Sequence, residues 1–178
     1  KPCKLVFQAG IFIFAKRILV VLIMTKEDLM RKAIELSIRN VAEGGGPFGA
    51  VIARNGEIVA TGVNRVTPDC DPTAHAEVSA IRAAAKALGT FDLSGCEIYT
   101  SCEPCPMCLG AIYWAHLDRM YYGNNKHGAA AIGFDDAFIY EELDLKPADR
   151  KLKSEVLLPE EAIQAFKDWE AKEDKTEY

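Results

Sequence analysis

Three cysteines, one histidine and one glutamate form the most distinctive chemical pattern in the sequence. Cys102, Cys105 and Cys108 recur every three residues in SCEPCPMC, and His75 stands two residues before Glu77 in PTAHAEV. If a helix begins at the cysteine motif, Cys105 and Cys108 lie on one face of it, and the N–H groups of its first turn favour thiolates. Two thiolates and one imidazole suit zinc. The pattern therefore predicts a zinc ion held by His75, Cys105 and Cys108.

The alternative is a closed structural zinc site with Cys102 as the fourth ligand. Cys102 follows a strand-like stretch, whereas Cys105 and Cys108 begin a helix, so its sulfur need not face the same side. A structural site also has no need of Glu77, whereas a catalytic zinc keeps a water in its fourth position and needs a base for its proton. His-x-Glu with Pro-Cys-x-x-Cys is the signature of zinc deaminases. We therefore expect a catalytic site without Cys102.

The predicted chemistry is hydrolytic removal of an amino group from a ring. Zinc lowers the pKa of its water toward ~7. Glu77 takes that proton, delivers it to a ring nitrogen, and later helps to protonate the departing amine. The expected products are a ring carbonyl and ammonia.

Helices that alternate with strands must position these residues. Helical spacing covers residues 25–43, 74–88, 106–115 and 159–172, and strand-like stretches cover residues 49–64, 96–101 and 119–123. The dipeptide Asn55-Gly56 predicts a two-residue hairpin turn within the first strand-like stretch. Gly44, Gly45 and Gly46 end a helix and precede a strand, the reverse of the order in a phosphate-binding loop. The pattern indicates one layered α/β domain.

Composition and charge narrow the partners. The chain has 178 residues, 49% of them hydrophobic, which is typical of a globular domain. Four of its 21 Lys and Arg residues precede Met24, so residues 24–178 carry 17 basic residues against 26 acidic ones, a net charge of −9. This acidic balance disfavours nucleic acid and does not penalise a small neutral substrate. Clustered thiols favour reduced cysteines and a cytoplasmic location.

Residues 1–23 differ from the rest of the chain. They contain no acids and two apolar runs separated by Lys16 and Arg17. Neither run reaches the ~20 residues of a membrane span, and no small-residue cleavage site follows. Met24 and Thr25 then resemble an initiator methionine and a helix N-cap. We expect the domain to comprise residues 24–178, preceded by a poorly ordered extension or a start-site error, with a membrane anchor as the alternative.

Further motifs carry a family resemblance. The sequence resembles the cytidine and deoxycytidylate deaminase superfamily, and within it the bacterial guanine deaminases, from about residue 26 to the end. The motifs are GGPFGAVI, DPTAHAEVSAIRAA, YTSCEPCPMCLGAIYWA, IGFDDAFIYEEL and a terminal tyrosine. The resemblance implies a three-layer α/β/α cytidine-deaminase-like domain with a central mixed five-stranded sheet and one Zn²⁺ per subunit. It also implies a domain-swapped homodimer whose C-terminal segment crosses to the neighbour.

The resemblance implies that guanine is converted to xanthine and ammonia, with Asp136 holding the base as a catalytic partner of Glu77. The residues that it implies for substrate binding are Asn64, Phe48, Ala76, Trp114 and Tyr178. Without the family, Phe48 and Trp114 could be core residues, Asn64 a turn residue and Asp136 a helix N-cap. The stretch NNKHGAAAIG departs from the family, and we expect its His127, like His116, to lie at the surface.

Other functions stay open from the sequence. A guanosine or other nucleoside deaminase needs only room for a ribose. A tRNA adenosine deaminase shares the zinc motif, but it must bind an anionic stem-loop, and this chain lacks an evident basic C-terminal helix. A zinc-stabilised interaction module would be a non-enzyme, with all four positions on the metal filled.

Overall fold

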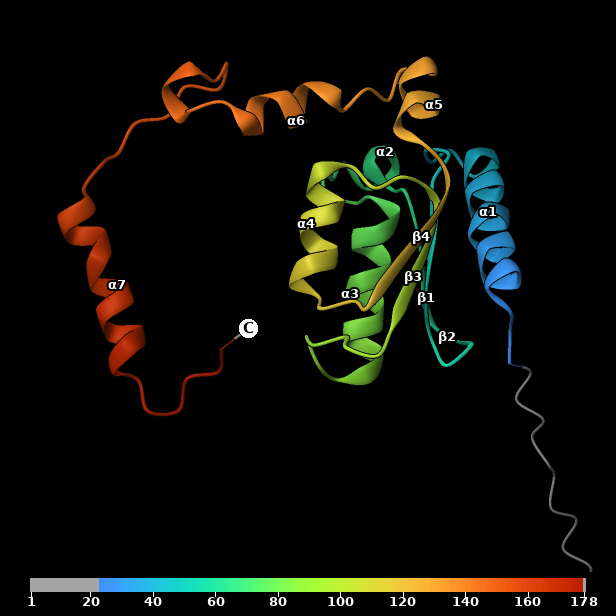
Figure 1. Ribbon diagram of the computed structural model, residues 1–178, viewed down its shortest axis with the longest axis horizontal. Helices are drawn as coiled ribbons and strands as arrows, with labels where there is room; N and C mark the ends of the chain where they lie inside the picture. The colour runs from blue at the N-terminus through green and yellow to red at the C-terminus, as the bar shows by residue number, and fades with distance from the viewer. Residues whose placement is uncertain (1–22, 178) are drawn as a thin grey trace, which may run out of the picture.

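A mixed sheet lies between two helical layers in the computed structural model, which describes residues 23–177 (Figure 1). The expected N-terminal extension, apart from Ile23, and the terminal Tyr178 lie outside the described residues. The strands are β1 (Gly49–Arg54), β2 (Glu57–Val63), β3 (Glu97–Cys102) and β4 (Arg119–Asn124), in the order β2-β1-β3-β4. β1 runs antiparallel to β2 and β3, and β4 runs parallel to β3. The sheet is therefore mixed, as expected.

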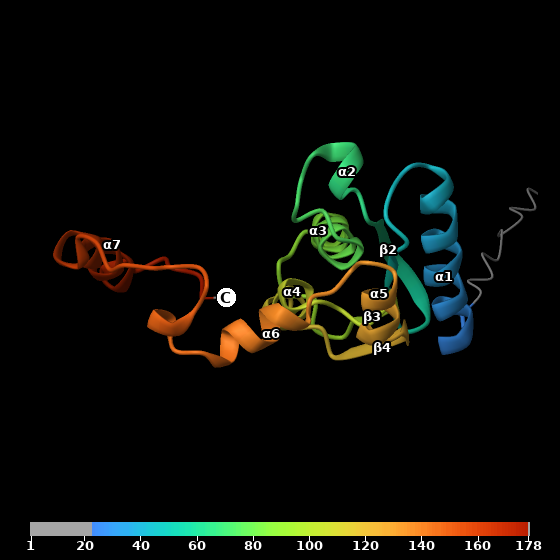
Figure 2. The same ribbon diagram turned by 90° about the horizontal axis from the view of Figure 1, so that it is seen from above.

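Helices cover both faces of the sheet. The helices of the described residues are α1 (Lys26–Ala42), α2 (Val66–Asp69), α3 (Ala76–Leu88), α4 (Pro106–Trp114), α5 (Lys126–Ala131), α6 (Ala137–Asp144), a 3-10 turn (Pro147–Asp149) and α7 (Pro159–Ala171). Figure 2 shows α1 on one face of the sheet and α3 and α4 on the other. None of the helices within residues 23–177 is both long and apolar enough to cross a membrane.

Local chemistry fixes the predicted elements. Thr25 caps α1 and forms a reciprocal capping box with Asp28. Asn55 and Gly56 have φ values of 53° and 78°, as a two-residue hairpin between twisted strands requires. The hairpin and all the longer helices and strands were thus predicted from sequence to within a few residues, whereas α2, α5 and α6 were not.

The core has two parts, one on each side of the sheet. Leu29 and Tyr99 are among the residues buried between α1 and the sheet, and Ile52 and Ile98 of the sheet belong with Ile112 of α4 to the cluster on the other side. Gly62 on β2 lets α3 approach the sheet, because a Cβ there would overlap the Ala76 oxygen and the Ala80 nitrogen. The start of α3, where His75 stands, is thereby fixed against the sheet.

The described sheet has four strands, so the expected fifth strand is not confirmed. After β4 the chain enters α5 and α6 and leaves the edge of the sheet, and residues 145–177, the arm, extend away from the layered body (Figure 1). Val156, Leu157 and Phe166 of the arm are 80%, 79% and 73% exposed. The arm therefore presents apolar side chains that the described residues do not cover.

Candidate active site

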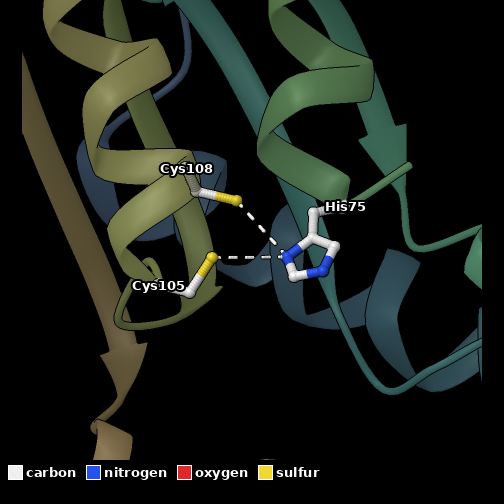
Figure 3. Close-up of side chains that lie close together, drawn as sticks. All are labelled: His75, Cys105 and Cys108. Carbon is white, nitrogen blue, oxygen red and sulfur yellow. Dashed lines mark hydrogen bonds between the residues drawn. The ribbon is translucent and has the colours of Figure 1, made fainter. Parts of the chain in front are cut away.

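Two helix N-termini meet beyond the carboxyl end of β3. His75 is the N-cap of α3, and Cys105 is the N-cap of α4. In Figure 3 the sulfurs of Cys105 and Cys108 point at one ring nitrogen of His75. The carboxyl ends of strands are where α/β folds commonly place their ligand sites.

Short turns set the two N-caps. Asp71 Oδ1 accepts a hydrogen bond of 2.8 Å from the Thr73 N–H, which closes a turn immediately before His75. Cys105 precedes Pro106 and has the extended conformation that a following proline favours, with φ −67° and ψ 169°. Pro106 occupies the first turn of α4, where its missing N–H costs nothing. The proline-rich sequence therefore presents both cysteines at one helix start.

The distances fit a zinc ion. Nδ1 of His75 lies 3.5 Å from Cys105 Sγ and 3.4 Å from Cys108 Sγ. In a tetrahedral site with Zn–S of about 2.3 Å and Zn–N of about 2.0 Å, the N···S edge is about 3.5 Å. All three ligand atoms lie within 4.8 Å of one another. His75, Cys105 and Cys108 are thus positioned to bind one metal ion, and their donor atoms suit zinc.

Cys102 lies outside this group of three. It is the last residue of β3, and its Sγ lies 3.6 Å from the Asn125 carbonyl oxygen, toward which its S–H points. Burial raises the pKa of its thiol, which disfavours the thiolate that a metal needs. The structure therefore gives Cys102 a hydrogen-bonding partner in place of a metal.

Cys105 and Cys108 shift the pKa values of each other's thiols in opposite directions. A hydrogen bond from Cys108 lowers the pKa of Cys105 to about 4. The same hydrogen bond, together with burial, raises the pKa of Cys108. Cys105 also raises the pKa of His75 by accepting a hydrogen bond from its ring. A metal ion would displace the protons of these groups, because its ligands must be thiolates and a neutral imidazole.

Glu77 is buried beside the metal ligands, with 5% of its surface exposed. Thr100 Oγ1 donates a hydrogen bond of 2.8 Å to its Oε1, and its Oε2 accepts one of 3.3 Å from Cys108 Sγ. Burial raises the pKa of its carboxyl group, and the hydrogen bonds from the backbone and from Thr100 partly offset that effect. A carboxylate whose pKa is raised toward neutrality is suited to accept and return a proton.

A cavity of about 690 Å³ opens onto His75, Glu77 and Cys105. Three of the residues predicted to bind substrate or assist catalysis, Asn64, Phe48 and Asp136, line this cavity. Ala76 is fully buried at the start of α3 and is not among the lining residues. Trp114 ends α4, is 66% exposed and does not line the cavity either. Asn64, Phe48 and Asp136 therefore share a cavity with the metal ligands, whereas Ala76, although adjacent to His75 in the chain, and Trp114 do not line it.

A glycine run shapes the cavity around Asn64. Asn40 Nδ2 donates hydrogen bonds to the carbonyl oxygens of Gly46 and Asn64, at 2.8 and 2.7 Å. A Cβ on Gly46 would lie 3.0 Å from the side chain of Asn64. The Asn64 side chain, whose Oδ1 accepts a hydrogen bond of 3.3 Å from the Val66 N–H, therefore needs glycine at residue 46.

Several residues of the site were not predicted. Thr100, which holds Glu77, is a polar residue inside a buried strand, and that position was an available signal. Glu103 lies inside the cysteine motif, and Phe134 packs edge-on against Phe48 with ring centroids 5.0 Å apart. Lys126 stands in the stretch that departs from the family, and sequence alone gave no sign that it lines the cavity. His116 and His127 are exposed, as expected.

A zinc-ligand triad with a buried carboxylate beside it, in an α/β/α domain, defines a hydrolase site of the zinc-dependent deaminase class. Residues 24–124 match the cytidine and deoxycytidylate deaminase zinc-binding region, and the chain belongs to this family.

Known relatives resemble the chain over most of its length. It is 47% identical to the guanine deaminase of Bacillus subtilis over 156 residues, which cover 87% of this chain and all of the relative. A crystal structure of that enzyme matches 87% of this chain and 99% of its own with a TM-score of 0.85. A guanine deaminase structure from Nitrosomonas europaea is 38% identical and covers 64% of this chain and 66% of its own, with a TM-score of 0.62. A tRNA-specific adenosine deaminase of Aquifex aeolicus is 32% identical over 82% of this chain and 94% of its own.

Proposed function

We propose that this protein is a zinc-dependent guanine deaminase, which converts guanine and water to xanthine and ammonia. The observation that carries the proposal is the position of Glu77 between Thr100 and the metal ligand Cys108, beside a cavity that also contains Asn64 and Asp136. The likeness to a guanine deaminase over 87% of the chain supports the choice of base.

Glu77 is the proton carrier of the proposed reaction. Zinc, when bound by His75, Cys105 and Cys108, makes a water molecule acidic enough to attack near pH 7. Thr100 fixes Oε1 of Glu77, so Oε2, beside Cys108, is the oxygen placed to take the proton of the attacking water. Glu77 then delivers this proton to a ring nitrogen of guanine, and a second transfer lets the amino group leave as ammonia.

Asn64, Asp136 and Phe48 are proposed to hold the base. The amide of Asn64 can offer both a donor and an acceptor to a purine edge. Asp136 can accept hydrogen bonds from N–H groups of guanine, which has several on one edge. Phe48, braced by Phe134, supplies an apolar wall for a flat ring. These three residues would hold a small neutral base, and none of their proposed contacts requires a charged ligand.

The alternative substrates differ in size and charge. Guanosine is the main alternative, because a cavity of about 690 Å³ has room for more than a purine. The charge of the cavity disfavours a tRNA substrate. Four acidic residues line it, Glu77, Glu103, Asp135 and Asp136, whereas Lys126 is the one lysine or arginine among the described lining residues. Phosphates would be repelled by such a lining.

We further propose that the protein forms a homodimer by exchange of its arm. β4 pairs only with β3 within the described residues, so its outer edge is open to another strand. The arm offers residues 153–158, which belong to no helix or strand and expose apolar side chains, followed by α7. An exchanged arm would supply the fifth strand of the expected sheet and cover apolar surface on both copies. Tyr178 would then close the partner's cavity, as the resemblance implies.

The cysteine chemistry supports a cytoplasmic location. Cys70, Cys96 and Cys102 are free thiols in addition to the two metal ligands. A reducing compartment keeps such thiols and the ligand pair in the reduced form.

A substrate panel tests the proposed function. Ammonia release and product identity are measured with guanine, guanosine, adenine, cytosine and cytidine, using protein loaded with one equivalent of zinc. We expect guanine to give the highest kcat/KM and stoichiometric xanthine. A preference for guanosine would move the assignment to a nucleoside deaminase, and turnover of none of the five would refute deamination of these bases.

A further inference from the structure

The wall of the cavity that carries Asp136 is held by few contacts. Gly133, Phe134, Asp135 and Asp136 line the cavity from the connection between α5 and α6, immediately before the arm. At one end of this wall, Phe134 packs edge-on against Phe48. The other end must be fixed from α5 or α6, because the arm beyond extends away from the layered body (Figure 1).

Lys126 stands where three segments meet. Its backbone N–H donates a hydrogen bond of 3.0 Å to Glu103 Oε2, in the loop between β3 and α4. Its ammonium lies over the ring of Tyr140 on α6, with Nζ 5.0 Å from the ring centroid. The hydroxyl of Tyr140 donates a hydrogen bond of 3.4 Å to the carbonyl oxygen of Pro104, which directly precedes the metal ligand Cys105. The side chain of Tyr140 on α6 thus contacts both Lys126 of α5 and the loop of the metal ligand.

We propose that Lys126, through its contact with the Tyr140 ring, is a positioning residue that keeps Asp136 against the metal site. Neither Lys126 nor Tyr140 needs to touch substrate for this role. The inference rests on the proposed function for its kinetic readout, because Asp136 is expected to hold the base.

The charge of Lys126 has a second effect on Asp136. Burial raises the pKa of Asp136 most, and Cys105 and Asp135 raise it further, whereas Lys126 lowers it. Asp136 in turn raises the pKa of His75. Removal of the Lys126 charge should therefore shift protonation of Asp136 to higher pH. A purely structural role for Lys126 would not produce that shift.

Substitutions at both partners test the contact. Lys126→Met keeps the length of the side chain without its charge, and Lys126→Arg keeps a cation that can stack on a ring. Tyr140→Leu removes the ring, and Tyr140→Phe removes only the hydroxyl. Lys86→Met, an exposed lysine on α3, is the matched control.

We measure kcat and KM for guanine across pH, zinc content, melting temperature, and hydrogen exchange of residues 133–144. Lys126→Met and Tyr140→Leu should each lower kcat/KM about threefold to tenfold, with zinc content unchanged. The acid limb of the Lys126→Met profile should move to higher pH, and exchange in α6 should accelerate. Lys126→Arg should keep kcat/KM, the acid limb and the exchange of α6 close to their wild-type values. The double variant Lys126→Met with Tyr140→Leu should lose no more kcat/KM than either single variant.

Kinetics and exchange like those of Lys86→Met would overturn the inference, and so would multiplicative losses in the double variant. If wild-type protein did not deaminate guanine, the proposed function would fail. The exchange of α6 would then still decide whether Lys126 positions the wall.

Discussion

Thr100 Oγ1 lies 2.8 Å from Oε1 of Glu77 and 3.0 Å from the carbonyl oxygen of Cys102. The hydroxyl can therefore donate to Glu77 when the carboxylate is ionised. When Glu77 holds the proton on Oε2, the hydroxyl can still donate to Oε1; if the proton is on Oε1, the hydroxyl can accept that hydrogen bond and donate to the carbonyl oxygen of Cys102 instead. One side chain thus satisfies Glu77 in both protonation states, as a proton carrier requires.

The Thr100 hydroxyl should therefore matter for turnover. Thr100→Val keeps the shape of the side chain and removes the donor, and we expect kcat to fall about tenfold or more with little change in zinc content, since a hydrogen bond to a charged group contributes about 1.5–3 kcal/mol. Thr100→Ser should recover most of the rate. Equal rates for the Val and wild-type proteins would remove Thr100 from the proton path.

Glu77→Gln tests the proton carrier itself. The amide keeps the size of the side chain but cannot take a proton, so kcat should fall by about 10² to 10⁴. Zinc content, measured by atomic absorption, should stay at one per chain, because Glu77 is not a ligand. A variant that retains both zinc and a near-normal rate would contradict the assignment.

The same substitution predicts a pH-dependent gain in the stability of the metal-free protein. The pKa of Glu77 is raised in the fold, so above its unfolded value of about 4.3 the folded state binds more protons than the unfolded state. The wild-type free energy of unfolding should thus fall as pH rises through the folded pKa, whereas the amide of the Glu77→Gln variant does not titrate. Urea denaturation of both proteins between pH 4 and pH 7 should show a widening advantage for the variant. A constant difference would contradict the sign.

The cysteines should separate into ligands and a bystander. Cys105→Ala removes one of three ligands and should abolish both tight zinc binding and activity. Cys102→Ala should keep one zinc per chain, because its sulfur points to the Asn125 carbonyl. Zinc loss in Cys102→Ala with retention in Cys105→Ala would reverse the ligand assignment.

Gly46→Ala should act through Asn64. The added methyl would stand 3.0 Å from the Asn64 side chain, which must shift or tilt. We expect KM for guanine to rise several-fold, with kcat and zinc content less affected, as for a lost binding contact. An unchanged KM would separate Asn64 from base recognition.

Sequence patterns predicted the elements that carry strong local signals. Thr25 and Asp28 start α1, Asn55-Gly56 turns the hairpin, and Pro106 begins α4. The metal ligands could also be predicted from the sequence, because cysteine and histidine donors at helix N-termini indicate a zinc site. The starts of α1 and α4 and the hairpin turn depend on residues close together in the chain, whereas the metal site was found from two short motifs whose ligands His75 and Cys105 are 30 residues apart.

The rest depends on contacts between distant segments. Helices α5 and α6 are six and eight residues long, too short for periodicity to reveal them. Lys126 reaches Tyr140 only because α6 folds back toward the loop at Pro104. The fifth strand was expected from the family, but residues 153–158 lie in an arm that does not return to its own sheet (Figure 1).

The coordination of the zinc ion tests the central claim most directly. X-ray absorption spectroscopy of the protein loaded with one zinc should show two sulfur ligands at about 2.3 Å and two nitrogen or oxygen ligands at about 2.0–2.2 Å, one of them exchangeable. That result matches three protein ligands and a position open to water. Three sulfur ligands would place Cys102 on the metal, close the site and contradict the account.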